Sequence, residues 1–310
     1  MKLIESLRSE GALSERQAAL LSRIESGAVI SLHSELRALL YLGVLFLVLG
    51  VGASVKRHFS ELGPAAILGS LSLAVALAFF WCFRTGPRFS ALKVDSPAAS
   101  FDYVLYLGCA FLGIEFGYIE SRFHLLENLW DYYLAASACL FFFLAYRFDN
   151  RLVLAMAVVN LGGWIGVRLN HCGLGAGTLK WQALLYAALL IGAGHSLKTA
   201  RLKEHFTDTY LTFGINLAFW AFLSGVFPHG FACMDFPLLM VLSVALIYYA
   251  LGRKRFDYLL YAVVYGYLGL SSAVIRELSG ASAVSLYLLL SAAAVMAVVF
   301  RCRGLLEQKE

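Results

Sequence analysis

Ten apolar stretches, each of about 17–23 residues, follow one another from Leu36 almost to the end of the chain, separated by short charged loops. A run near 20 apolar residues matches a hydrocarbon core of about 30 Å at a rise of about 1.5 Å per residue. Only helices or closed barrels satisfy the backbone in lipid, and these runs lack the alternation of barrel strands. We therefore predict an all-α polytopic membrane helical bundle of about ten transmembrane helices, preceded by a short cytosolic N-terminal helical hairpin.

Composition supports a single membrane domain with small cytosolic ends. Hydrophobic residues make up 60% of the chain and charged residues 15%, against about 25% charged residues in soluble domains. We expect a hairpin over 1–34, a transmembrane domain over 35–301 and a tail over 302–310. The expected spans are approximately 36–55, 62–83, 101–120, 126–146, 151–169, 181–198, 208–227, 236–252, 257–275 and 283–300.

The distribution of basic residues predicts the orientation. With these spans, 19 of the 25 Lys and Arg residues lie on the side of the N-terminus. Because cytoplasmic loops carry an excess of Lys and Arg, both termini are predicted to be cytoplasmic. This excess also accounts for most of the net charge of +5, so the charge gives no reason to expect a nucleic-acid partner.

The first 34 residues read as two short amphipathic helices. Ser14 and Gln17 have the spacing of a capping box at the start of the second helix. Helices this short cannot bury enough apolar surface to fold alone. We expect them either to rest on the cytoplasmic ends of the spans or to dock a cytosolic or membrane protein partner.

A six-residue phrase recurs at predicted helix starts. Phe101–Tyr106 reads FDYVLY and Phe256–Tyr261 reads FDYLLY, with weaker echoes at Arg147–Asn150 and His205–Tyr210. All four open odd-numbered spans, which indicates a two-helix unit repeated in parallel, as in many transporter folds. Locally, the Asp is expected to cap free amides and face the helix dipole, with the aromatic residues at the lipid headgroups.

The opening segment and this phrase resemble those of a known family. The opening reads LRSEGALSERQ over Leu7–Gln17, and with the many spans and the Phe-Asp-Tyr-x-Leu-Tyr phrase it is similar to a bacterial predicted membrane protein family, domain-of-unknown-function family 2157. The first helix lacks the Trp expected in that family. The resemblance implies a cytosolic helical segment ahead of many spans in the bacterial inner (plasma) membrane, and it implies no activity.

Glu115 is the most informative intramembrane residue. It lies well inside the span 101–120, between Gly113 and Gly117. A central charged residue costs roughly 2.5–3.5 kcal/mol on insertion scales, so it is a functional-site hypothesis by default. Two interpretations remain open: a carrier or ligand-binding carboxylate, or a carboxylate that reaches or pairs at the external interface, for example with Arg122.

Other polar residues are weaker ligand-binding candidates. Asn160 with Trp164, and Asn216 with Trp220, repeat one i, i+4 spacing on two spans, where an Asn more often hydrogen-bonds between helices. Arg168, at the end of a span, could join other external charges in a shallow polar vestibule or remain solvated. The charges considered with it are Glu120, Arg122, His124, Glu127, Asp131, His171, Arg276 and Glu277.

Two cysteines are predicted in external loops, Cys172 and Cys233. Disulfides persist in that compartment, so a bridge between them is one hypothesis and two unpaired thiols another. With His171 and His229 they offer two His and two Cys, but the spacing matches no recognised zinc or copper motif. We predict no metal and no cofactor.

No catalytic or nucleotide-binding motif is found in the sequence. The sequence therefore favours a non-enzymatic envelope scaffold or regulatory protein. The alternatives are a small-solute or ion carrier that uses Glu115, and a membrane-embedded enzyme acting on a lipid-linked substrate. The enzyme would require external carboxylates and arginines such as Asp131, Arg168 and Arg276 to converge.

Overall fold

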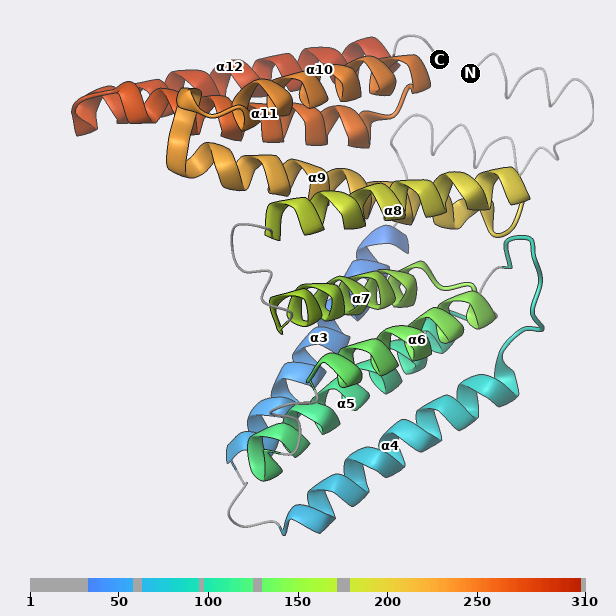
Figure 1. The fold of residues 1–310 in the computed structure, drawn as a ribbon. Coiled ribbons are helices and arrows are strands. Elements are labelled where there is room, and N and C mark those ends of the chain that lie inside the picture. The colour runs from blue at the N-terminus through green and yellow to red at the C-terminus, as the bar shows by residue number, and fades with distance from the viewer. Residues whose placement is uncertain (1–32, 58–62, 95–97, 125–129, 172–178, 308–310) are drawn as a thin grey trace, which may run out of the picture. The chain divides into compact units, whose positions relative to one another are not determined.

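The computed structural model describes residues 33–57, 63–94, 98–124, 130–171 and 179–307. Within these ranges the chain is α-helical without strands, which confirms the predicted all-α class (Figure 1). The helices are α3 (His33–Arg57), α4 (Pro64–Thr85), α5 (Ala99–Phe123), α6 (Trp130–Phe148), α7 (Arg151–His171), α8 (Leu179–Ala200), α9 (Thr207–His229), α10 (Asp235–Arg253), α11 (Phe256–Glu277) and α12 (Ala281–Glu307). Short 3-10 helices η1 (Glu204–Phe206) and η2 (Gly230–Ala232) flank α9.

Each of the ten α-helices in the described ranges coincides with one predicted span. Seven of them are long and apolar enough to cross a membrane: α4, α5 and α7 to α11. A 22-residue helix such as α4 is about 33 Å long, enough for a hydrocarbon core of about 30 Å. The predicted N-terminal hairpin falls almost wholly on residues outside the described ranges.

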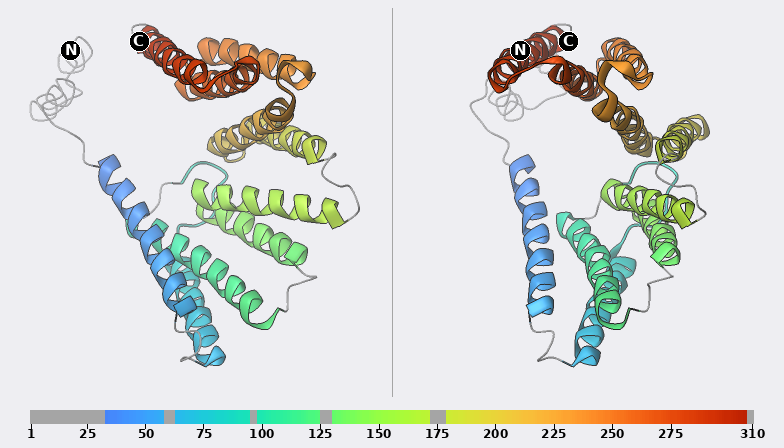
Figure 2. Two further views of the ribbon diagram at one scale, coloured as in Figure 1. Left: turned by 90° about the vertical axis from the view of Figure 1, so that its left-hand side faces the viewer. Right: turned by 60° about the vertical axis from the view of Figure 1, so that its left-hand side comes forward.

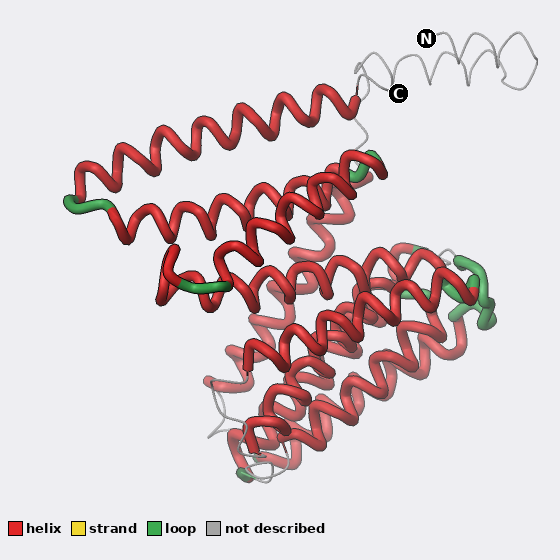
Figure 3. The backbone as a smooth tube through the Cα atoms, turned by 45° about the horizontal axis from the view of Figure 1, so that its top comes forward, coloured by secondary structure: helices red, strands yellow, loops and turns green. Residues whose placement is uncertain are grey.

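Successive helices pack as antiparallel pairs. The most extensive contacts join α4 to α5, α6 to α7, α8 to α9 and α10 to α11, and the tube in Figure 3 follows these hairpins. Each pair begins with an even-numbered helix. The Phe-Asp phrase and its echoes therefore stand at the turn within each hairpin, because they begin its second helix.

The chain divides into two compact units. The first contains α3, α4 and α5, and its buried contacts include Ile67 and Leu71 against Tyr118. Gly108 allows the close approach of α5 to α4, since a Cβ there would lie 2.8 Å from Phe79 Cε1. Phe101 is buried and contacts the Trp81 ring, with centroids 6.0 Å apart.

The second unit contains α6 to α12 and the connection that begins at Pro87. Its largest apolar cluster joins α9, α10 and α11 through residues such as Phe219, Leu239 and Leu259. α8 and α9 lie side by side in both views of Figure 2. Gly214 permits this approach, because a Cβ there would lie 2.7 Å from Ile191 Cγ1.

Candidate functional site

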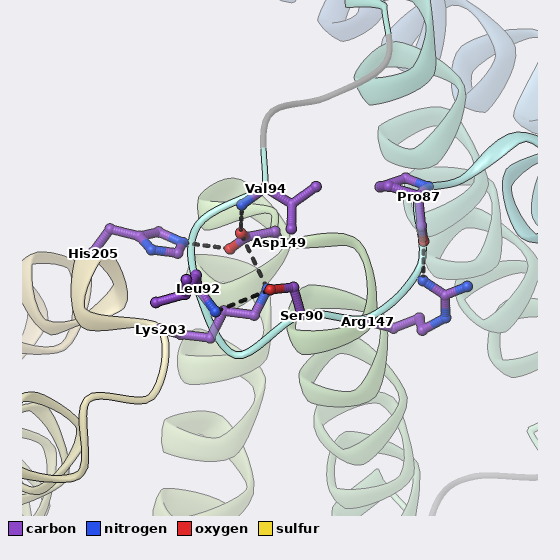
Figure 4. Close-up of polar contacts among 8 residues, drawn as sticks. All are labelled: Pro87, Ser90, Leu92, Val94, Arg147, Asp149, Lys203 and His205. Atoms are coloured by element: carbon purple, nitrogen blue, oxygen red, sulfur yellow. Dashed lines mark hydrogen bonds and ion pairs between the residues drawn. The ribbon is translucent and has the colours of Figure 1, made fainter.

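Three inter-helix connections of the second unit meet at Asp149 (Figure 4). Asp149 lies in the turn between α6 and α7 with a left-handed φ of 58°, a conformation that Asp and Asn adopt more readily than other L-residues. The following amide, of Asn150, donates to the Ala145 carbonyl at 3.1 Å and closes the end of α6. The turn thereby presents the Asp149 carboxylate to the other two connections.

The Asp149 carboxylate is almost completely buried and has three partners. Its Oδ2 accepts from the Val94 amide at 2.5 Å and lies 3.1 Å from the Lys203 Nζ. Its Oδ1 contacts the His205 Nε2. Only 1% of each of the Asp149 and Lys203 side chains is exposed, so the ion pair is withdrawn from water.

Lys203 binds the connection from Pro87 to Val94 in two further ways. Its own amide donates to the Ala91 carbonyl at 2.8 Å, and its ammonium lies 5.5 Å from the centre of the Phe89 ring. Arg147, at the end of α6, donates to the Pro87 carbonyl. The connection is therefore fastened near its start, its middle and its end.

We call the residues that make these contacts the Asp149 cluster: Pro87, Ala91, Val94, Arg147, Asp149, Lys203 and His205. Phe206, next to His205, is fully buried and meets the Tyr146 ring edge-on, with centroids 5.2 Å apart. Burying a charge is costly unless it is paired and hydrogen-bonded, and here the carboxylate is both. The arrangement therefore holds the three inter-helix connections together.

The Asp149 cluster is not among the sites predicted from the sequence, although the Phe-Asp echoes contain part of it. The Asp of the phrase was expected to cap a helix. At α7 the cap is Asn150, whose Oδ1 accepts from the Leu152 and Val153 amides at 3.0 and 3.1 Å. At α5 and α11 the residue preceding the helix makes no side-chain cap, and the phrase's carboxylates lie in the first turn.

The first residue of three copies of the phrase is buried, and the expectation that the aromatic residues lie at headgroup level remains a prediction. Phe101, Phe148 and Phe206 are 1%, 2% and 0% exposed. They are packed inside the protein, so burial of the Phe at the hairpin turn explains the phrase better than contact with lipid headgroups.

Glu115 lies in the first unit, where its carboxylate accepts a hydrogen bond from the Ser72 hydroxyl of α4. This contact joins α4 to α5 in the middle of two spans. The alternative partner that the sequence suggested, Arg122, lies in the last turn of α5. The proposed carrier role of Glu115 remains a prediction.

The two Asn–Trp pairs are placed differently from each other. The Asn160 amide donates to the Met156 carbonyl of its own helix at 2.8 Å. The Asn216 amide likewise donates to Thr212, but its carbonyl accepts from the Tyr265 hydroxyl of α11 at 2.8 Å. Trp220 packs edge-on to the same Tyr265 ring. Thus Asn216 and Trp220 come together through α11, whereas Trp164 has no described contact that unites it with Asn160.

Arg168 pairs with Asp131 across α6 and α7. Its Nη1 lies 2.8 Å from the Asp131 Oδ2, and the two side chains are 49% and 2% exposed. Arg276, by contrast, donates to the Phe227 carbonyl, and Glu127 lies outside the described residues. Asp131 and Arg168 therefore come together as an ion pair, and the convergence of further charges that the enzyme hypothesis requires remains a prediction.

The Cys172–Cys233 disulfide remains a prediction because Cys172 lies outside the described residues. The Cys233 thiol approaches the Gly230 carbonyl at 3.3 Å. Among the side chains that the structure describes, no group of three or more His, Cys, Asp and Glu is placed to hold a metal ion.

Comparison with protein families assigns the N-terminal half of the chain. Residues 5–154 match the family described as "Predicted membrane protein (DUF2157)". These residues belong to the DUF2157 family. The resemblance inferred from the opening segment and the Phe-Asp-Tyr phrase is thereby confirmed, and the helices agree with its description as a membrane protein. No curated protein and no solved structure shows significant similarity to the chain.

The match includes Asp149 and the connection from Pro87 to Val94, while Lys203 and His205 lie beyond it. The description names no activity. The function of the chain is therefore inferred from its own residues.

Proposed function

We propose that the chain is a non-enzymatic membrane scaffold or regulatory protein that holds a partner protein against the connection from Pro87 to Val94. The observation that carries the proposal is the fastening of this connection by the buried Asp149 cluster. On the predicted orientation this end of the helices faces the cytoplasm, where residues 1–34 are also expected to lie.

The fastened connection displays apolar side chains. Phe89 is 58% exposed and Leu92 is 72% exposed, although each lies within three residues of a backbone contact to the Asp149 cluster. Arg88 and Lys93 flank them and are also exposed. Aromatic and Arg side chains are enriched at protein interfaces, and the two cations favour a partner whose apolar segment carries acidic neighbours.

A pre-formed surface suits a scaffold. A loop that is held before binding loses little conformational entropy when the partner docks. A buried ion pair is weak evidence for stability, and its best-attested use is to specify one arrangement. We infer that the Asp149 cluster fixes the conformation in which Phe89 and Leu92 are presented.

Photo-crosslinking in cells tests the proposal. A photoreactive phenylalanine analogue at position 89 or 92 is expected to give a discrete protein adduct. The same analogue at Phe80, which is 62% exposed on the membrane-spanning helix α4, is the matched control and should give lipid adducts. Asp149→Ala should abolish the protein adduct at position 89. Lipid adducts alone at both 89 and 92 would contradict the proposal.

The carrier remains the second candidate, because a carboxylate within a span is a functional-site hypothesis by default and Glu115 contacts Ser72 inside the first unit. A solute flux that disappears in a folded Glu115→Gln protein would make it the better description. A membrane enzyme would need the Asp131–Arg168 pair for turnover of a lipid-linked substrate.

A further inference from the structure

An apolar cavity of about 270 Å³ lies between α7, α8 and α9 of the second unit. Its walls include Val158 and Gly166 of α7, Ala183 and Leu190 of α8, and Leu217 of α9. None of the six side chains predicted as ligands is among those that line it. An apolar cavity of about 150 Å³ can stay dry and bind a benzene-sized molecule, so this one has room for a larger apolar group.

The cavity occupies one half of the membrane-spanning length. On α8 its walls run from Leu179, the first residue of the helix, to Leu190, about its midpoint. These 11 steps correspond to about 16 Å of helix, close to half of a hydrocarbon core of about 30 Å. On α7, which is antiparallel to α8, the cavity walls run from Val158 near mid-helix to Gly166 near the C-terminal end. The walls on the two helices therefore lie in the same leaflet.

The chemistry of the walls suits a hydrocarbon chain. The Tyr186 hydroxyl is engaged, because it donates to the Val158 carbonyl at 2.7 Å. Gln182 is the other side chain of the walls that carries a polar group, and the remaining lining residues are apolar or glycine. A Cβ built on Gly162 would lie 2.9 Å from Tyr186 Cε1, whereas one built on Gly166 would meet nothing within 4 Å. The cavity is thus closed by Tyr186 at Gly162 and has free space at Gly166.

The cavity is accessible from the surface of the unit. Val159 and Leu179 contribute to its walls and are 59% and 48% exposed. Both belong to helices of membrane-spanning length. This opening on the surface of the unit suits an occupant that enters sideways from the bilayer.

We propose that this cavity binds one acyl chain of a bilayer phospholipid from the leaflet next to the connection between α7 and α8. The length of the walls, their apolar character and the sideways opening all fit an extended chain that reaches from the interface to the midplane. On the predicted orientation this is the external leaflet. The site is separate from the Asp149 cluster, so the inference does not rest on the proposed function.

Lipid retention tests the inference. The full chain would be loaded with a phosphatidylglycerol that carries a diazirine in the middle of one acyl chain, transferred to detergent, and examined by native mass spectrometry before and after irradiation. We expect one lipid to be retained per chain. Its adducts should map to the cavity walls on α7, α8 and α9.

Matched variants decide whether the retained lipid occupies the cavity. Gly166→Phe places a ring in the open space and should reduce retention at least tenfold. Gly192→Phe, at an exposed glycine of α8 where a Cβ also meets nothing within 4 Å, should change retention less than twofold. Ala183→Leu, with the exposed Ala188→Leu as control, repeats the comparison with a smaller side chain should Gly166→Phe fail to fold.

Three results would overturn the inference. They are a wild-type protein that retains no lipid, adducts confined to helices other than α7, α8 and α9, and equal retention by each cavity variant and its control.

Discussion

At the scale of single residues, Asp149 is the group on which most depends. One buried carboxylate faces the Lys203 ammonium, the His205 ring and the Val94 amide. The Coulombic attraction compensates for the loss of hydration only while all partners are present. The residue is therefore more sensitive to substitution than the exposed charges of the same turns.

Asp149→Ala is expected to lower the free energy of unfolding by about 3–5 kcal/mol, because it leaves the Lys203 ammonium buried without its carboxylate. Thermal unfolding in detergent would measure the loss. Asp257→Ala is the matched control, since that carboxylate is 67% exposed and 3.7 Å from Arg255, and such pairs contribute about 0–1 kcal/mol. Equal losses in the two variants would refute the distinction.

Sequence reasoning missed Asp149 for a physical reason. Lys203 is one of the 19 basic residues counted for the orientation, yet only 1% of its side chain is exposed. Its burial depends on the connection from Pro87 reaching a turn more than 50 residues later in the chain. The hydrophobic periodicity and the local spacing of residues do not show which distant loops come into contact. The partner of a charged loop residue therefore cannot be predicted from its neighbours in the sequence.

At the scale of elements, the helix positions predicted from the sequence agree with the structure, and seven of the ten described α-helices are long and apolar enough to cross a membrane. The span expected over 208–227 is α9 (Thr207–His229), and that over 101–120 is α5 (Ala99–Phe123). A run of apolar residues is a local property, and it fixes helix position without any knowledge of the neighbours. The residues that cap the helices were harder to predict. At α7 the side chain of Asn150, and not that of the Asp of the phrase, accepts the hydrogen bonds of the first-turn amides.

Asn150→Ala should therefore destabilise α7, by about 1 kcal/mol, since it removes the acceptor for the Leu152 and Val153 amides. Asn150→Ser should keep most of the stability, because Ser is also a favourable N-cap residue. The comparison requires melting curves of the two variants under identical detergent conditions. A Ser variant as unstable as the Ala variant would show that Asn150 acts through something other than the cap.

At the scale of the whole molecule, the chain is a membrane protein built from helical hairpins, and two kinds of site emerge from it. Polar contacts gather at the turns, as in the Asp149 cluster, while the cavity between α7, α8 and α9 is apolar. This division follows from the solvent: ionic groups are tolerated near the interface, and apolar space inside the bilayer is available to lipid. The proposed partner protein docks beside the first site, and the proposed lipid chain binds in the second.

Amide hydrogen exchange is the most direct test of the central claim, that the Asp149 carboxylate holds the connection from Pro87 to Val94. The wild-type protein and Asp149→Asn would be compared in the same detergent by mass spectrometry of peptides. We predict faster exchange in the variant for the Val94 and Lys203 amides, whose acceptors are Asp149 and Ala91, with peptides of α10 and α11 unchanged. Unchanged protection of both amides in the variant would contradict the account.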